Sequence, residues 1–267
     1  MCGIVGGPGF VDRAAVDRLR HRGPDATGAW QGSRYWLGHT RLSIIDVGSR
    51  SDQPFARGDV VLVYNGELWN YRELRAELAL AGESFSTEGD TEVVAAALAR
   101  WGEEALPRFE GMFALAWTAD SGATLRLARD RHGEVPLHLD ARTGAFASEL
   151  KALPPGAAAG WVEPGALVQL GPDGIRARSW YVLRTARSED PAPVAIRRGI
   201  AAGVTEREVS DVGFCILLSG GLDSSIIAHH VAEHRRGVVG FTGGGQGSPA
   251  FERASREVAE RFGLVLR

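Results

Sequence analysis

The sequence predicts an α+β domain of two stacked antiparallel sheets with helices, followed by part of an α/β doubly wound parallel-sheet domain. Three observations support this prediction. Short strand-like runs joined by turns, with a few helical segments, fill roughly the first two thirds of the chain. A polar stretch with two prolines follows, and apolar runs then alternate with helical segments. We therefore expect a first domain at 1–184, a linker at 185–195 and a second domain at 196–267.

Composition limits the classes of protein. The 267 residues are 44% hydrophobic and 24% charged, as in ordinary globular proteins. The formal charge of −3, with no run of Lys or Arg, gives no reason to expect a nucleic-acid partner. No apolar run reaches the ~18 residues of a membrane span, and no signal segment opens the chain. Cys2 and Cys215 are too few for a disulfide scaffold or a cysteine-based metal site, so we expect a cytoplasmic protein with reduced thiols.

The first residues combine a short buried strand with a reactive side chain. Removal of Met1, which the small Cys2 side chain permits, would leave a thiol and a free α-amine on one residue. An α-amine titrates near ~7.7–8.0 and a thiol near ~8.5, so the amine can accept the thiol proton near neutral pH. Nucleophile and base then come from the same residue. The alternative is that a cysteine at position 2 is accidental.

The rest of the first domain alternates helical and strand-like segments. Apolar spacing predicts helices at 11–20, 68–81 and 91–101, the second ended by Gly82 and the third capped by Thr91. Runs rich in β-branched and aromatic residues predict a strand pair or a bent strand at 36–46 and strands at 60–64, 109–117, 124–130, 135–139, 145–148, 161–170 and 175–181. Arg41 lies in the first of these strands, where a guanidinium requires a carboxylate partner.

Several polar residues of this domain have two interpretations. Asn65-Gly66-Glu67 follows a buried strand, so it is either a tight turn or a pair of donors for a developing oxyanion. Asp90 is either a solvated residue at a helix start or part of a site. The turn after the first helix holds more charge than a turn requires, with Arg20, His21, Arg22 and Asp25.

The second domain begins with a helix at 196–209 and an apolar strand at 212–218. The strand leads directly into Ser-Gly-Gly-Leu-Asp-Ser-Ser at 219–225 and then a helix at 226–235. Glycines, hydroxyls and a helix N-terminus together predict a phosphate cradle, the alternative being a plain glycine-serine turn. No Gly-Lys-Ser/Thr follows, which excludes the kinase-type loop. Asp223 would repel a phosphate unless it holds a cation, so the motif implies Mg²⁺. Further segments follow at 237–241, 250–262 and 263–267 as strand, helix and strand.

Taken in order, these motifs resemble the glutamine-hydrolysing asparagine synthetases. Members of that family join a class II, N-terminal-nucleophile glutamine amidotransferase domain to an ATP-pyrophosphatase domain. The resemblance rests on matching segments at 1–4, 20–25, 39–46, 65–67, 111–113, 129–130, 148–149 and 219–225. It implies that Cys2 attacks the side-chain amide of glutamine with its own α-amine as base, giving glutamate and ammonia.

The resemblance also implies roles for the other site residues. Asn65 and the N–H of Gly66 would form the oxyanion hole. Arg41 would bind the carboxylate of glutamine and Glu67 and Asp90 its ammonium, with Ile44 and Ile45 lining the pocket. This half would need no cofactor.

In the second domain the resemblance implies ATP-dependent amidation of aspartate through an aspartyl-AMP. The residues implied at ATP are Leu217, Ser219, Gly220, Gly221, Asp223, Ser224, Ser225 and Gly243. Of these, Asp223 would also lie near Mg²⁺.

The match to the family is incomplete. The family's Ser-Gly-Glu-Gly-Ser-Asp-Glu motif is absent from the sequence, and 241–245 is richer in glycine than the corresponding family strand. We therefore expect a fragment, a truncated paralogue or half of a split enzyme, which alone hydrolyses glutamine without making asparagine. A second copy or a complementary synthetase chain would be its partner. Two alternatives are an amidotransferase or peptide cyclase that acts on another carboxylate, and a non-catalytic partner subunit.

Overall fold

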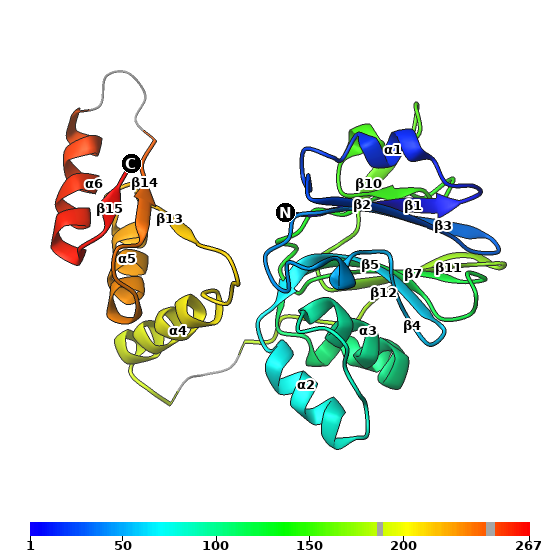
Figure 1. The fold of residues 1–267 in the computed structure, drawn as a ribbon, viewed down its shortest axis with the longest axis horizontal. Coiled ribbons are helices and arrows are strands. Elements are labelled where there is room, and N and C mark those ends of the chain that lie inside the picture. The colour runs from blue at the N-terminus through cyan, green and yellow to red at the C-terminus, as the bar shows by residue number, and fades with distance from the viewer. Residues whose placement is uncertain (186–188, 244–248) are drawn as a thin grey trace. The chain divides into compact units, whose positions relative to one another are not determined.

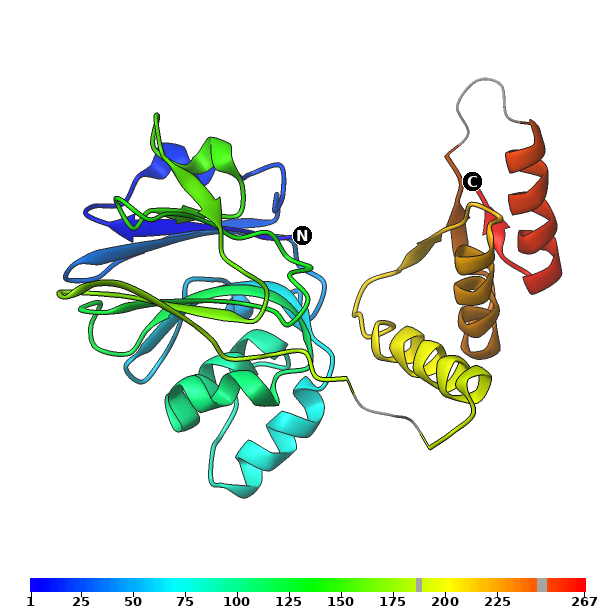
Figure 2. The same ribbon diagram turned by 180° about the vertical axis from the view of Figure 1, so that it is seen from behind.

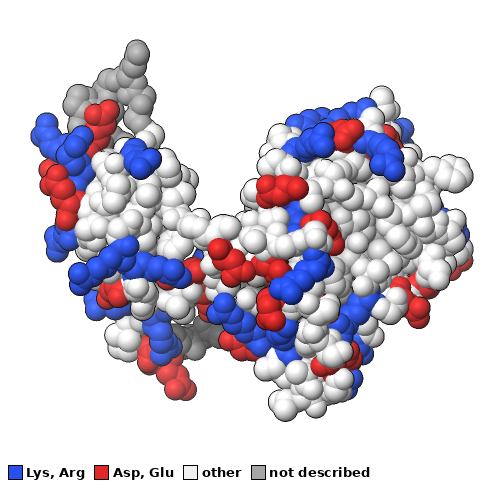
Figure 3. Space-filling view, viewed as in Figure 1, with Lys and Arg blue, Asp and Glu red and all other residues white. Residues whose placement is uncertain are grey.

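The computed structural model describes residues 1–185, 189–243 and 249–267 and divides into two compact units (Figure 1). The first unit is Met1–Arg184 and the second is Thr185–Arg267. On the face seen in Figure 3, acidic and basic side chains are interspersed over each unit. Across the described residues, no helix combines the length and the apolar character that crossing a bilayer requires.

The first unit contains two stacked antiparallel sheets (Figures 1 and 2). One has the order β10-β8-β9-β1-β3-β2 and consists of β1 (Gly3–Pro8), β2 (Ala26–Gln31), β3 (Tyr35–Arg41), β8 (His138–Asp140), β9 (Phe146–Ala147) and β10 (Ala159–Trp161). The other has the order β12-β11-β7-β6-β5-β4 and consists of β4 (Phe55–Arg57), β5 (Val60–Leu68), β6 (Gly111–Thr118), β7 (Leu125–Arg129), β11 (Ala166–Gly171) and β12 (Gly174–Ser179). The predicted α+β class is confirmed.

The core lies between these sheets because successive side chains of a strand point to opposite faces. Both sheets contribute to one buried apolar cluster, which includes Ile4, Leu37, Val63, Ala116, Leu127 and Val168. Helix α1 (Arg13–Asp17) packs outside the first sheet, where Val16 joins Trp36 in a second cluster. Helix α3 (Asp90–Trp101) covers β4 and β5 of the second sheet, and α2 (Tyr71–Leu80) packs against α3. Short 3-10 helices η1 (Ser49–Ser51), η2 (Gly102–Arg108) and η3 (Leu150–Ala152) complete the unit.

Some predicted elements of this unit are wrong in extent. The helix predicted at 11–20 ends at Asp17, because tight turns through Leu19 and Arg22 replace it. The segment predicted at 36–46 as a strand pair or a bent strand contains one strand, which ends at Arg41. β5 continues through Asn65 and Gly66, which pair with Ala114 and Phe113 of β6, so the tight-turn interpretation is wrong. Edge strands β2 and β4 were not predicted.

The second unit is a small parallel sheet of order β13-β14-β15 with helices. Its elements are α4 (Ala192–Glu206), β13 (Cys215–Leu217), α5 (Leu222–His234), β14 (Val239–Phe241), α6 (Pro249–Phe262) and β15 (Val265–Leu266). The predicted α/β class is confirmed. α4 begins inside the stretch predicted as linker, and α5 begins earlier than predicted, so that Asp223 to Ser225 lie in its first turn. Gly244 and Gly245, in the glycine-rich stretch, lie outside the described residues.

Candidate active site

A pocket in the first unit gathers every residue predicted for the glutaminase half. Cys2 precedes β1, Arg41 ends β3, Asn65 to Glu67 lie in β5 and Asp90 begins α3. The lining residues are Met1, Cys2, Arg41, Leu42, Ile44, Ile45, Gln53, Tyr64, Asn65, Gly66, Glu67, Asp90, Thr91 and Met112. The two sheets therefore bring segments distant in sequence to one site.

Cys2 is held by contacts to its backbone and its thiol. Its Sγ accepts the N–H of Leu42 at 3.3 Å, and its carbonyl accepts Nε of Arg22 at 2.8 Å. Burial raises the pKa of the Cys2 thiol, although the Leu42 N–H and the nearby α-amine lower it in part. The thiol is therefore protonated at neutral pH and needs a base to become a nucleophile.

The α-amine beside this thiol belongs to Met1 in the structure. Burial lowers the pKa of that amine. An amine at this end of the chain is thus neutral at lower pH than an exposed one, and a neutral amine can take a proton. While Met1 is attached, the nitrogen of Cys2 is an amide and cannot act as that base.

Asn65 has the clearest mark of a binding group. Its side chain is 1% exposed, and neither its amide nitrogen nor its oxygen has a hydrogen-bond partner among the described residues. Burying an amide without hydrogen-bond partners costs free energy, so such a group usually binds a ligand or a water molecule. Gly66 follows it, and a Cβ there would lie 2.2 Å from the carbonyl oxygen of Met112. Only glycine fits this close strand pairing.

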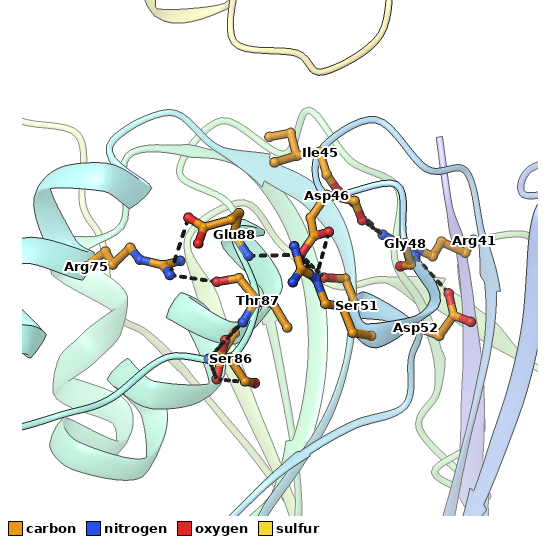
Figure 4. Close-up of polar contacts among 12 residues, drawn as sticks. Arg41, Ile45, Asp46, Gly48, Ser51, Asp52, Arg75, Ser86, Thr87 and Glu88 are labelled. Carbon is orange, nitrogen blue, oxygen red and sulfur yellow. Dashed lines mark hydrogen bonds and ion pairs between the residues drawn. The ribbon is translucent and has the colours of Figure 1, made fainter.

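Arg41 has the carboxylate partner that the sequence required. Its Nη1 donates to Asp52 Oδ1 and to the carbonyl of Gly48, both at 2.7 Å (Figure 4). Its Nη2 donates to the carbonyl of Asp46 at 2.5 Å and to that of Ile45 at 3.4 Å. The loop 42–54 thus fixes the guanidinium in one orientation at the pocket wall.

Asp90 is buried, so its interpretation as a solvated residue is wrong. Its Oδ2 accepts the hydroxyl of Tyr64 at 2.9 Å and the N–H of Leu68 at 3.2 Å. Burial raises the pKa of the Asp90 carboxyl, and these hydrogen bonds lower it in part. Gly89 is the N-cap of α3 and no side chain caps the helix, so the predicted Thr91 cap is wrong as well.

Some lining residues were not predicted. Gln53 brackets Tyr64, accepting its N–H at 2.6 Å and donating to its carbonyl at 3.1 Å. Tyr64 in turn donates to Asp90, so Gln53 supports that carboxylate indirectly. The position of Tyr64 directly before Asn65 was a usable signal, whereas no periodicity marks Gln53.

The charged turn at 20–25 contacts segments that adjoin the pocket. Arg22 and His21 both contact Glu149 Oε1 at 2.9 Å, and Asp25 accepts the N–H of Ser43 at 2.7 Å. Burial alone would raise the pKa of Glu149, but hydrogen bonds from Arg22, His21 and Lys151 lower it to about 2. The turn therefore connects the Cys2 backbone to the loop that follows β3.

The loop after β13 has a donor set that fits phosphate. Gly220 has a φ of +74°, and a Cβ there would lie 2.5 Å from the backbone of Ala254 in α6. The hydroxyl groups of Ser219 and Ser224 lie 2.9 Å apart at the start of α5, where the first backbone N–H groups lack helical acceptors. Hydroxyl groups and backbone N–H groups are donors that an anion accepts. Leu217 and Gly243 are exposed where β13 ends and after β14.

In the part of the second unit that the structure describes, Asp223 and a cluster on α5 carry side chains that can bind a metal ion. Asp223, predicted at Mg²⁺, is exposed in the first turn of α5, and its carboxylate is the type of ligand that Mg²⁺ prefers. Further along α5, ligand atoms of His229, His230 and Glu233 all lie within 4.8 Å of one another. These three groups already pair with each other, His230 Nδ1 being 3.0 Å from Glu233 Oε2.

Comparisons with known proteins agree with this division of the chain. Residues 1–170 match the glutamine amidotransferase domain family and residues 195–266 match the asparagine synthase family. The rice protein named asparagine synthetase [glutamine-hydrolyzing] 2 is 35% identical over 296 residues, which cover 99% of this chain and 49% of the rice protein. Asparagine synthetase [glutamine-hydrolyzing] 1 of Arabidopsis thaliana is 33% identical over 295 residues, with the same coverage. The chain thus spans about half the length of the curated relatives it matches.

Solved structures share the fold at low sequence identity. Glutamine phosphoribosylpyrophosphate amidotransferase from B. subtilis, complexed with ADP and GMP, aligns with a TM-score of 0.58 at 18% identity and covers 100% of this chain and 65% of its own. A structure described as the allosteric regulatory enzyme of purine biosynthesis gives 0.59 at 16% identity, covering 100% of this chain and 80% of its own. Because the family model matches most of the chain, the protein belongs to the glutamine amidotransferase domain family, and a segment that matches the asparagine synthase family follows that domain.

Proposed function

We propose that Met1–Arg184 hydrolyses L-glutamine to glutamate and ammonia. The observation that supports this most is the buried Asn65 amide, which has no partner among the described residues and lines the same pocket as the Cys2 thiol. An oxyanion acceptor would satisfy its N–H₂ group at the moment charge develops. The charges of the pocket, one guanidinium with two carboxylates, are those that a free amino-acid head group requires.

The chemistry starts with removal of Met1, which frees the α-amine of Cys2. That amine takes the Sγ proton, and the thiolate attacks the Cδ carbonyl carbon of glutamine. Asn65 and the Gly66 N–H stabilise the resulting oxyanion. The protonated amine then gives its proton to the leaving nitrogen, so ammonia departs and a thioester remains. Water, activated by the same amine, releases glutamate and restores the thiol.

Glutamine is held at its other end. Arg41 is proposed to bind the α-carboxylate, and Glu67 and Asp90 the α-ammonium, with Ile44 and Ile45 along the pocket. Asp90 can do this because its hydrogen bonds from Tyr64 and Leu68 fix one carboxylate oxygen. Binding through both charged groups would select a free amino acid over an amide within a peptide.

For the second unit we propose the role that the asparagine synthase match suggests. ATP would bind at the loop 219–225 with Mg²⁺ near Asp223, and ammonia would amidate the side chain of aspartate through an aspartyl-AMP. The names of the relatives support this proposal, but they belong to proteins about twice as long. A second copy or a complementary synthetase chain is the proposed partner, and a cytoplasmic location fits a nucleophilic thiol.

Release of glutamate and ammonia from L-glutamine tests the proposal. We expect turnover by the wild-type chain, none by Cys2→Ala, and wild-type turnover by Cys215→Ala, which removes the exposed second cysteine. Equal rates in wild type and Cys2→Ala would exclude the proposed mechanism. With ATP and aspartate added, we expect no asparagine from the chain alone. Asparagine formed by the chain alone would overturn that part of the account.

A further inference from the structure

Asp46 contacts the two segments of the pocket that carry Arg41 and Asp90, the residues proposed to bind the charged groups of the amino acid. It belongs to the loop 42–54, is 7% exposed, and has a φ of +46°. A non-glycine residue in this left-handed region is uncommon and usually needs support from its surroundings. Its backbone and its side chain contact different segments (Figure 4).

The backbone of Asp46 contacts the carboxylate-binding side of the pocket. Its carbonyl oxygen accepts Nη2 of Arg41 at 2.5 Å. Asp52 and the carbonyl of Gly48 hold the other terminal nitrogen of the guanidinium. The conformation of residue 46 therefore helps to set where the guanidinium lies.

The side chain of Asp46 contacts the opposite side. Its Oδ2 accepts the backbone N–H of Glu88 at 2.8 Å, the hydroxyl of Ser51 at 2.9 Å and Nε of Arg50 at 3.1 Å. Glu88 lies two residues before Asp90, which is the first residue of α3. The two segments touch closely, since a Cβ at Gly89 would lie 3.4 Å from the Cβ of Asp46.

We propose that Asp46 is a positioning residue that holds the segments carrying Arg41 and Asp90 in the relative position in which they bind the carboxylate and the ammonium of one amino acid. This inference rests on the proposed glutaminase function and deepens it, because it assigns the selection of a free α-amino acid to a residue that touches neither charge of the substrate. Hydrogen bonds from Glu88, Ser51 and Arg50 offset the effect of burial and lower the pKa of Asp46, so the carboxylate that joins the two segments is charged at neutral pH.

Two substitutions of Asp46 test the proposal. Asp46→Gly removes both side-chain acceptors, keeps the backbone carbonyl and tolerates the positive φ, while Asp46→Asn keeps the shape and one side-chain acceptor. We expect the KM for L-glutamine to rise about tenfold or more in Asp46→Gly and less in Asp46→Asn, with kcat within about twofold of wild type. Alkylation of Cys2 by iodoacetamide should keep its wild-type rate. Asp59→Asn, which changes an exposed aspartate of the same unit, is the matched control and should leave KM unchanged.

Hydrogen exchange gives a readout that does not depend on turnover. We expect the Glu88 amide to exchange faster in both Asp46 variants, because its acceptor is lost or weakened. If Asp46→Gly does not fold, Asp46→Asn and Ser51→Ala, which each remove fewer contacts, should shift KM and exchange in the same direction by smaller amounts. Active variants with KM within twofold of wild type and unchanged Glu88 exchange would overturn this inference alone. A wild-type chain without glutaminase activity would overturn the proposed function and this inference together.

Discussion

Arg22 joins the backbone of Cys2 to the carboxylate of Glu149. Its Nε donates to the Cys2 carbonyl at 2.8 Å and its Nη1 to Glu149 Oε1 at 2.9 Å. The start of β1, which follows Cys2, is held by Ser148, whose hydroxyl accepts the N–H of Ile4 at 3.0 Å. A residue from the turn after α1 and the segment after β9 thus fix the nucleophile from two directions.

Replacement of Arg22 by lysine tests this arrangement. A lysine has one ammonium and cannot reproduce two hydrogen bonds from a planar fork. We expect Arg22→Lys to lower kcat for glutamine hydrolysis by about tenfold to a hundredfold, because a small displacement of the nucleophile is costly. Steady-state kinetics measure it, with Arg18→Lys at an exposed position as the control. Wild-type kcat in Arg22→Lys would show that the contact does not position Cys2.

Replacement of Asn65 by alanine should lower the activity of the protein without lowering its stability. Removal of one oxyanion donor typically lowers kcat by about 10²–10³, and we expect this for Asn65→Ala with little change in KM. Since the amide has no partner among the described residues, its removal should leave the free energy of unfolding unchanged or raise it. Kinetics and denaturant unfolding give the two values. A variant that is destabilised and still fully active would contradict this assignment.

His39 makes the first unit sensitive to acid. Burial, together with the positive charge of Arg41, lowers its pKa to about 3, although the hydrogen bond with the Tyr64 carbonyl opposes this. The unfolded state takes up the proton near pH 6.5, before the folded state does, so stability is complete above that pH and falls as pH drops toward 3. The slope from this group approaches about 1.4 kcal/mol per pH unit.

Tryptophan fluorescence can follow this loss in the first unit, because all seven tryptophans lie at or before position 180. His39→Gln has no group that titrates in this range and can still donate to the Tyr64 carbonyl. We expect its stability to depend less on pH between about 6 and 3.5. The same slope in wild type and variant would assign the acid sensitivity to other groups.

The two glycines of the loop after β13 should respond differently to alanine. Gly220 has a positive φ and no room for a Cβ beside Ala254, whereas the nearest atom to a Cβ at Gly221 is the flexible Ser219 hydroxyl at 3.3 Å. Gly220→Ala should destabilise the second unit by about 1–3 kcal/mol or more, while Gly221→Ala should cost much less. Hydrogen exchange over β13 and α5 distinguishes them. Similar exchange in both variants would mean that the loop is not constrained at Gly220.

The sequence alone predicted the fold class from local patterns, and it predicted the pocket residues mainly through the family resemblance of several short motifs. Arg41 in an apolar strand required a carboxylate, and Asp52 supplies it. Local signals misjudged Asn65-Gly66, where pairing with β6 overrides the turn preference of the dipeptide. They also missed edge strand β2, whose Ala and Gly residues have weak strand propensity.

Other features depend on contacts that are far apart in sequence. Asp90 is polar at a helix start and looked solvated, but Tyr64 and Leu68 of β5 bury and bind it. The loop 42–54 has no regular period, so the link from Asp46 to Glu88 could be found only in three dimensions. Contacts of this kind between distant segments produce no local pattern in the amino-acid sequence, so the roles of these residues could not be predicted from it.

Covalent labelling of the two cysteines tests the central claim most directly. A chloroketone analogue of L-glutamine presents its electrophilic carbon where the amide carbon of the substrate would lie. We expect intact-mass and peptide analysis to show a chain without Met1 that carries one adduct on Cys2, and excess L-glutamine to slow its formation. The exposed Cys215 is the internal control and should react only with unselective reagents such as iodoacetamide. A chain that keeps Met1, or an analogue that labels Cys215 as readily as Cys2 without protection by glutamine, would contradict the account.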